Sequence, residues 1–305
     1  MSIDTSVEEI IALVPELARP GRVVSGLPGG LTNVNHKVTT DRGAYVVRRW
    51  TDDSTLLSIS RDNEYENSLR AAEVGVGAPL VAYLPEHSAM VFGFLEGEVM
   101  SPRKLRCGRH LPAVARSCAR LHTARRFHQD FNMFELQAGY LDLVRARGFR
   151  LPDRYEEFSP HVVAIRDALS ARDEGTVPCH NDLLAENLIR GGDYGFYLID
   201  YEYSGNNDPC FELGNLWSES DLSAAQLEEL VSAYYGRPLR HKVARARLWG
   251  LMSKYGWTLW ASIQGGLSKL DFDFWAWGME KYERALREFD SPEFERWLEE
   301  ARRAD

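Results

Sequence analysis

Cys179 to Trp217 reads CHNDLLAENLIRGGDYGFYLIDYEYSGNNDPCFELGNLW, and this stretch decides the fold. It is dense in carboxylate, amide and aromatic side chains. Its centre predicts a β-hairpin, because two β-prone runs, 188–190 and 197–199, flank the turn-rich segment 191–195. A hairpin at this point would bring the polar residues on either side of it together.

The pairing of the hairpin predicts a site for a small cation. If Arg190 pairs with Tyr197, Asn187 lies opposite Asp200. Directly opposed residues of an antiparallel pair share a face, with Cβ atoms about 4.5–5.5 Å apart. An amide and a carboxylate would therefore converge at the open end of the hairpin, where the oxygen ligands suit Mg²⁺ and substrate phosphates. Asp182 stands five residues before Asn187.

These spacings carry a resemblance. His-x-Asp, an Asn five positions after the Asp, and a hydrophobic hairpin ending in Asp are similar to the catalytic loop and metal segment of protein-kinase-like phosphotransferases. Within that superfamily, HND, EN, LIDYEYSGNND and FELGN resemble the choline/ethanolamine kinase family, and aminoglycoside phosphotransferases are more distant relatives. The resemblance covers about residues 23–285 and is densest at 29–38, 179–219 and 249–282.

The resemblance implies an α+β, protein-kinase-like fold of two lobes. We expect a small N-terminal lobe with an antiparallel sheet at 1–95, which would bind the nucleotide. A larger, mainly helical C-terminal lobe at 96–305 would hold the catalytic and substrate-binding residues. At 305 residues the chain is long enough for two cores.

The same resemblance implies a role for each polar residue of the central stretch. Asp182 would accept the proton of a substrate hydroxyl, and His180 would brace the loop. Asn187 and Asp200 would hold Mg²⁺ against the phosphates of ATP. Glu202, two residues past Asp200 on one strand face, would support the metal ligands, unless it is a surface carboxylate.

Two segments of the N-terminal lobe are expected to hold the nucleotide. In GGLTNVNHKV, glycine amides with Thr32 and Asn33 can donate hydrogen bonds to phosphates, although such a segment is also a common hairpin tip. Arg48 ends the strand where protein kinases have Lys, and the choline kinase family uses Arg. Glu64, with Glu66 as a competing choice, would hold this cation.

The C-terminal part of the chain predicts an aromatic substrate pocket. Trp257 and Trp260 share a helix face, a pattern that most often marks a buried core. The eight tryptophans favour a pocket, because aromatic rings bind quaternary ammonium groups. By resemblance to choline kinases, Trp277 and Tyr203 would add further walls, and Glu219 would be an acid near the cation.

Composition excludes several classes of protein. A formal net charge of -9 and a pI near 5.5 argue against a nucleic-acid partner and favour a cationic substrate. The four cysteines form no C-x-x-C pair, and the N-terminal residues show no basic and then apolar signal. We expect a cytoplasmic protein with no membrane partner, and a homodimer stays open.

These observations predict an ATP- and Mg²⁺-dependent kinase of a small cationic alcohol, with choline ahead of ethanolamine. A kinase of ethanolamine, thiamine or an aminoglycoside is the alternative within the superfamily. A non-catalytic binding protein of kinase-like fold is the alternative outside it, and it is disfavoured because Asp182, Asn187 and Asp200 are all present.

Overall fold

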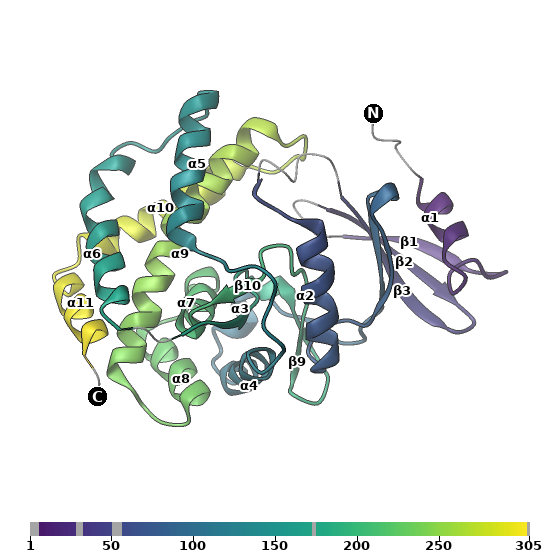
Figure 1. Ribbon diagram of the computed structural model, residues 1–305, viewed down its shortest axis with the longest axis horizontal. Helices are drawn as coiled ribbons and strands as arrows, with labels where there is room; N and C mark the ends of the chain where they lie inside the picture. The colour runs from purple at the N-terminus through teal and green to yellow at the C-terminus, as the bar shows by residue number, and fades with distance from the viewer. Residues whose placement is uncertain (1–5, 29–32, 51–56, 173–174, 304–305) are drawn as a thin grey trace.

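The small lobe is built on one antiparallel sheet. The computed structural model describes residues 6–28, 33–50, 57–172 and 175–303. The sheet has the order β1-β2-β3-β5-β4 (Figure 1). Its strands are β1 (Val23–Leu27), β2 (Asn33–Thr40), β3 (Gly43–Trp50), β4 (Leu80–Leu84) and β5 (Ala89–Gly93), with the short η2 turn (Pro85–His87) between the last two. Helices α1 (Val7–Leu13) and α2 (Arg61–Glu73) complete the lobe. The observed antiparallel sheet confirms the one predicted for this lobe.

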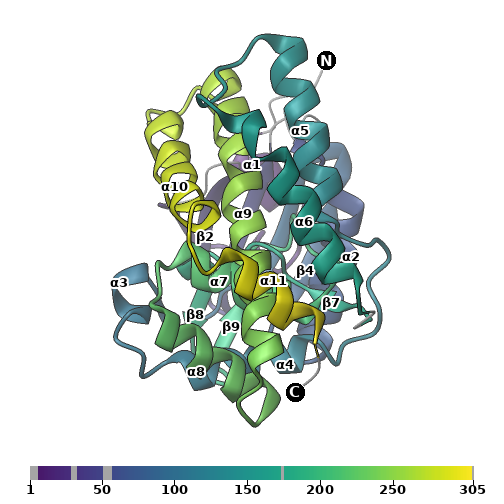
Figure 2. The same ribbon diagram turned by 90° about the vertical axis from the view of Figure 1, so that its left-hand side faces the viewer.

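The large lobe is mainly helical. Its helices are α3 (Pro102–Leu105), α4 (Leu111–Leu121), α5 (Met133–Arg147), α6 (Ser159–Ser170), α7 (Pro209–Glu219), α8 (Ala224–Tyr235), α9 (Arg240–Leu267), α10 (Phe274–Phe289) and α11 (Phe294–Arg302). The remaining pieces are β6 (Glu98–Val99), β7 (Val177–Cys179), β8 (Leu188–Arg190), β9 (Phe196–Leu198), β10 (Gly205–Asn207), η3 (Tyr155–Phe158) and η4 (Ala185–Asn187). The α9 helix is buried over most of its length because α5, α7, α10 and α11 pack around it (Figure 2).

Each lobe has its own hydrophobic core. In the small lobe, Ile10 and Ile11 of α1 pack with Val38 and Val47 of the sheet. The bigger cluster is built around α9 in the large lobe, and Leu57, Ala71 of α2 and Val76 also belong to it. No helix among the described residues is long and apolar enough to cross a membrane.

The predicted hairpin forms, but its predicted register is wrong by one residue. Arg190 pairs with Phe196, not with Tyr197, and Leu188 pairs with Leu198. The loop is closed by a hydrogen bond from the Gly191 amide to the Gly195 carbonyl, which leaves five residues in the turn. The strand β9 ends at Leu198, and the backbone of Asp200 has a positive φ of 74°, which is not an extended conformation. Residues 200–202 therefore form no strand.

The contact between α7 and α9 depends on two glycines. A Cβ on Gly214 would lie 2.7 Å from the amide nitrogen of Gly250 and closer still to the carbonyl oxygen of Ala246. Both contacts are backbone atoms, which cannot move aside as a side chain would. We expect Gly214→Ala to lower the free energy of unfolding by about 3 kcal/mol, the upper end for overpacked cores.

A urea titration measures this loss, and Gly139→Ala is the matched control. Gly139 lies in the middle of α5, and a Cβ there meets nothing within 4 Å. This control should stabilise the protein by about 0.5–1 kcal/mol, because alanine loses less entropy in a helix. If Gly214→Ala unfolds at the same urea concentration as the parent, the close contact of the two helices is wrong.

Candidate active site

A cavity of about 710 Å³ lies where the small lobe meets the large one. Its wall includes Arg48 and Val46 from β3 and Leu27 from β1. Most of the predicted site residues line it: Arg48, Asp182, Asn187, Asp200, Glu202, Tyr203, Glu219, Trp257, Trp260 and Trp277. Thr32 lies outside the described residues.

His180 shapes the loop that carries Asp182. Its Nε2 lies 2.7 Å from the carbonyl oxygen of Ile199, and its Nδ1 accepts from the Asp182 amide at 3.3 Å. A ring that donates through Nε2 and accepts through Nδ1 is neutral. Burial lowers the pKa of His180, which agrees with this state. His180 therefore holds Asp182 and Ile199 together through its ring, and it is not among the residues that line the cavity.

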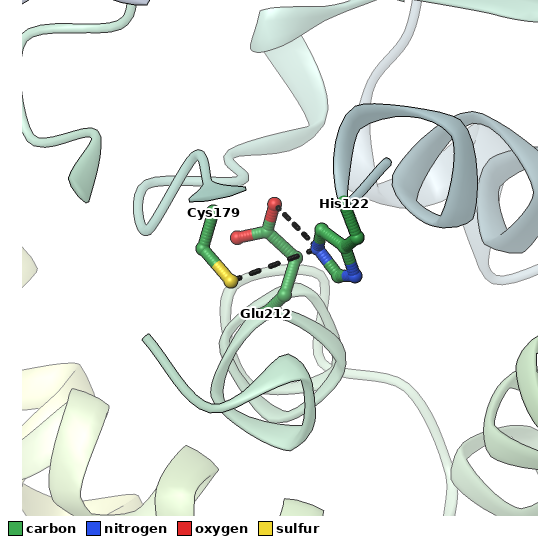
Figure 3. Close-up of side chains that lie close together, drawn as sticks. All are labelled: His122, Cys179 and Glu212. Atoms are coloured by element: carbon green, nitrogen blue, oxygen red, sulfur yellow. Dashed lines mark hydrogen bonds and ion pairs between the residues drawn. The ribbon is translucent and has the colours of Figure 1, made fainter. Parts of the chain in front are cut away.

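A buried cluster of His122, Cys179 and Glu212 holds this loop in place. Glu212 of α7 accepts hydrogen bonds from the amides of His180 at 2.9 Å and Asn181 at 2.8 Å. His122 Nε2 lies 3.7 Å from Glu212 Oε1 and 3.6 Å from Cys179 Sγ (Figure 3). Burial would raise the pKa of Glu212, but the hydrogen bond and charge of His122, together with the hydrogen bond from the His180 backbone amide, outweigh it and lower the pKa overall. The loop is thus held by an ionised carboxylate.

Asp182 sits half-buried in the cavity wall. Burial, followed by the charges of Asp200, Glu219 and Glu202, raises the pKa of its carboxyl group well above the ordinary value, and Lys281 opposes this shift. The raised pKa makes Asp182 more basic than an ordinary carboxylate. Geometry and charge therefore suit it to accept a proton.

Asn187 is oriented by the same loop. Its Nδ2 donates to the backbone carbonyl of Asp182 at 2.9 Å. This bond leaves Oδ1 as the atom of Asn187 that can bind a cation. Asp200 lines the same cavity, and with a quarter of its side chain exposed it can reach a ligand.

Arg48 is the centre of a buried ion-pair network. It lies 2.8 Å from Glu64, 2.5 Å from Asp200 and 3.3 Å from Glu202. Burial alone would lower the pKa of Arg48, but the surrounding carboxylates raise it. Arg61 supports the network by contacting Glu64 at 2.6 Å and Glu202 at 3.2 Å. Arg61 was not predicted as a site residue, because a basic residue in the first turn of a helix is usually exposed.

The ion-pair network shows which of the two glutamates of α2 contacts Arg48. Glu64 is buried and pairs with Arg48, whereas Glu66 is half exposed and lies 3.8 Å from Arg70. Glu64 is therefore the partner of Arg48. Glu66 is the solvated one.

Glu202 is buried in this network and is not a surface carboxylate. The expectation that it shares a strand face with Asp200 is wrong, since the chain turns at Asp200. Glu202 Oε2 instead accepts from Asn33 Nδ2 at 3.2 Å, which draws Asn33 toward the network. Burial, then the charge of Asp200, raises the pKa of Glu202 to about 7.

A group of aromatic side chains, called the aromatic wall below, lines part of the cavity. Trp260 Nε1 donates to the Tyr203 hydroxyl at 2.9 Å, and the Tyr203 ring meets Trp257 edge-on at 4.9 Å between centroids. Trp277 meets Trp260 at 5.5 Å. Phe272, which the sequence analysis did not single out, also lines the cavity and is 41% exposed. The tryptophan stripe is therefore both core and cavity wall.

Glu219 lies against this wall. Its side chain is 2% exposed and forms an ion pair with Lys281 of α10. Lys281 Nζ also lies 4.0 Å from the centroid of the Trp277 ring. The acid that the sequence analysis placed near a substrate cation thus has an internal cation beside it.

Comparisons agree with this architecture. A sheet lobe and a helical lobe, with a loop carboxylate and an arginine facing a shared cavity, define a kinase-like phosphotransferase. Residues 23–246 match the phosphotransferase enzyme family. A crystal structure of a choline/ethanolamine kinase family protein from Mesorhizobium loti is 30% identical, with a TM-score of 0.84 over 96% of each chain.

Two further relatives are similar over most of the chain. Ethanolamine kinase 2 of Rattus norvegicus is 26% identical over 85% of this chain and 73% of its own. Choline kinase LicA from Streptococcus pneumoniae, at 24% identity, shares the fold with a TM-score of 0.76 over 92% of this chain and 97% of its own. The chain belongs to the phosphotransferase enzyme family, and within it to the choline/ethanolamine kinases. It is a phosphotransferase with an alcohol group as acceptor.

Proposed function

We propose that the protein phosphorylates choline to phosphocholine with ATP. The observation that carries this proposal is the aromatic wall of Tyr203, Trp257, Trp260 and Trp277 beside the buried Glu219, at one end of the cavity that holds Asp182. The relatives support a small amino alcohol, since those named above are an ethanolamine kinase and a choline kinase.

The wall favours choline for a physical reason. A quaternary ammonium group has no N–H to donate, and aromatic faces stabilise it by about 0.5–2 kcal/mol each when it is desolvated. A primary ammonium needs hydrogen-bond acceptors to replace its water. The rings of the aromatic wall offer aromatic faces to a cation but few hydrogen-bond acceptors, so they suit a quaternary ammonium better than a primary one.

Asp182 is the residue we assign as the base. Phosphoryl transfer needs positioning and charge stabilisation more than covalent chemistry. Asp182 would orient the hydroxyl of choline toward the transferred phosphoryl group and accept its proton. His180 and the Glu212 cluster would hold the Asp182 loop in place through the bonds described above.

Asn187 and Asp200 are the residues we assign to Mg²⁺. Asn187 Oδ1 and the Asp200 carboxylate are oxygen donors on one cavity wall, and an oxygen-only set of one amide and one carboxylate fits Mg²⁺ with its phosphates and waters. The ion would neutralise charge on the phosphates of ATP. Glu202 would support Asp200 through their shared partner Arg48.

The nucleotide would lie under the small lobe. Arg48, held by Glu64, would face the phosphates, and Thr32 and Asn33 would donate further bonds. On this proposal the lobes divide after Leu95, so that residues 1–95 bind the nucleotide and 96–305 bind the alcohol. We also propose a cytoplasmic location, in keeping with four free cysteine thiols.

Ethanolamine is the second candidate. Glu219 Oε1 is buried and has no hydrogen-bond donor within the part of the chain that the structure describes. A primary ammonium could donate to it, and a quaternary one could not. This single acceptor is weaker support than the aromatic faces, because an ammonium group has three N–H bonds to satisfy.

Replacing one ring of the wall tests the choline assignment. We expect Trp257→Leu to raise KM for choline roughly 2- to 30-fold, the range that corresponds to one cation–π contact. Steady-state ADP release at varied choline measures it. Trp275→Leu is the matched control, because Trp275 packs against Arg150 and does not line the cavity. If both variants keep the parent KM, the ammonium group binds elsewhere.

The pH dependence of turnover tests the assignment of Asp182. Its pKa is raised, so Asp182 takes up a proton at a higher pH than an ordinary Asp, and a protonated carboxyl group cannot act as a base. We expect kcat/KM to fall as pH drops through this raised pKa, with the acid limb well above pH ~4. A profile of kcat/KM from about pH 4 to 9 measures it. A profile of kcat/KM with no acid limb would contradict the assignment.

A further inference from the structure

Lys281 lies beside the substrate end of the cavity without lining it. It stands one helical turn after Trp277 on α10, and this spacing places its side chain over the ring. Its side chain is 6% exposed, and its ammonium group pairs with Glu219 Oε2. One buried cation therefore occupies both a face of Trp277 and one oxygen of Glu219.

The pair leaves Glu219 with one oxygen for a ligand. Oε1 is buried, and no described residue donates a hydrogen bond to it. Glu219 lines the cavity together with Trp257 and Trp260. A substrate cation that enters thus meets aromatic faces, a carboxylate whose charge is largely balanced, and one unsatisfied acceptor.

We propose that Lys281 is a specificity-determining residue that biases the pocket toward a quaternary over a primary ammonium by holding Glu219. This inference rests on the proposed function of the site. A primary ammonium must replace three hydrogen bonds to water, whereas a quaternary ammonium has none to replace. By taking Oε2, Lys281 removes an acceptor that only the primary ammonium could use.

Removing Lys281 should therefore change which substrate is preferred. Without Lys281, both oxygens of Glu219 are available to a ligand. The unbalanced negative charge of Glu219 attracts choline and ethanolamine alike, so the effect of charge cancels when their kcat/KM values are divided. We expect Lys281→Met to lower the ratio of kcat/KM for choline to kcat/KM for ethanolamine about tenfold, equivalent to about 1.4 kcal/mol. Lys281→Arg keeps the cation and should keep the ratio within about twofold.

A variant of Glu219 separates this effect from damage to the fold. In Glu219→Gln no carboxylate remains for Lys281 to hold, so adding Lys281→Met to it should change the ratio little. A general loss of packing would lower kcat/KM for both substrates together and leave the ratio unchanged. If Lys281→Met does not fold, Lys281→Leu also removes the donor to Glu219, and the same fall in ratio is expected.

The outcomes distinguish this inference from the proposed function. A fall in ratio in Lys281→Met that is absent in the Glu219→Gln background supports the role of Lys281. An unchanged ratio in a folded variant that still binds ATP overturns it and leaves the kinase assignment intact. If the parent protein turns over neither choline nor ethanolamine, the proposed function itself fails.

Discussion

Replacing Asp182 by Asn is expected to lower kcat by about 10²–10⁴, the range that positioned acid–base groups contribute. Asn has the size of Asp but cannot accept the proton of the substrate hydroxyl. Because the loop is held by His180 and Glu212 through its backbone, the amide should leave the fold in place. Coupled ADP release with choline measures the loss.

Two further results sharpen this prediction. Asp193→Asn is the matched control, since Asp193 is exposed in the turn of the neighbouring hairpin, and it should keep the parent kcat. The Asp182→Asn variant should still bind nucleotide, which separates lost chemistry from lost binding. Full turnover by this variant would show that the base is another residue.

The second large effect is expected at Arg48. Arg48→Met removes the cation that lies between Glu64, Asp200 and Glu202 and leaves Arg61 as the remaining cation of that network among the described residues. Breaking a buried ion pair from one side typically costs about 3–5 kcal/mol, because the remaining charge is uncompensated. We expect a loss of stability of this size in a urea titration, together with loss of ADP release.

Two further variants give the comparison, one with the same loss of charge and one that keeps the charge at position 48. Arg42→Met removes an exposed arginine from the turn between β2 and β3 and should shift stability by less than about 0.5 kcal/mol. Arg48→Lys should restore only part of the stability, since a single ammonium cannot bridge three carboxylates as a guanidinium does. Parent-like stability and turnover in Arg48→Met would contradict the central place of Arg48.

Much of the fold followed from local patterns. The glycine-rich turn and the β-prone runs around it predicted the hairpin at 188–198, and helix periodicity predicted the long helix that carries Trp257 and Trp260. The register failed because the turn was counted one residue too long. Asp200 has a positive φ, which is uncommon in residues other than glycine. An Asp directly after a β-prone run gives no signal of this conformation, so the sequence could not predict it.

The missed residues act through contacts between distant segments. Glu212 of α7 holds the loop that carries Asp182, and Lys281 of α10 reaches Glu219. Neither has a local signal, because a Glu or Lys on a helix is most often solvated. Lys281 stands four residues after Trp277, a spacing that is visible in the sequence. Only the structure shows that side chains of α10 reach the C-terminal end of α7, where Lys281 meets Glu219.

The most direct test of the account is ADP release by the parent protein with ATP and Mg²⁺ against choline, ethanolamine, thiamine and kanamycin. We expect turnover that is highest with choline, since the residues of the aromatic wall and Asp182 line one cavity. Turnover with thiamine or kanamycin alone would keep the phosphotransfer residues and contradict the assigned pocket. Nucleotide binding without turnover of any of the four would contradict the central claim.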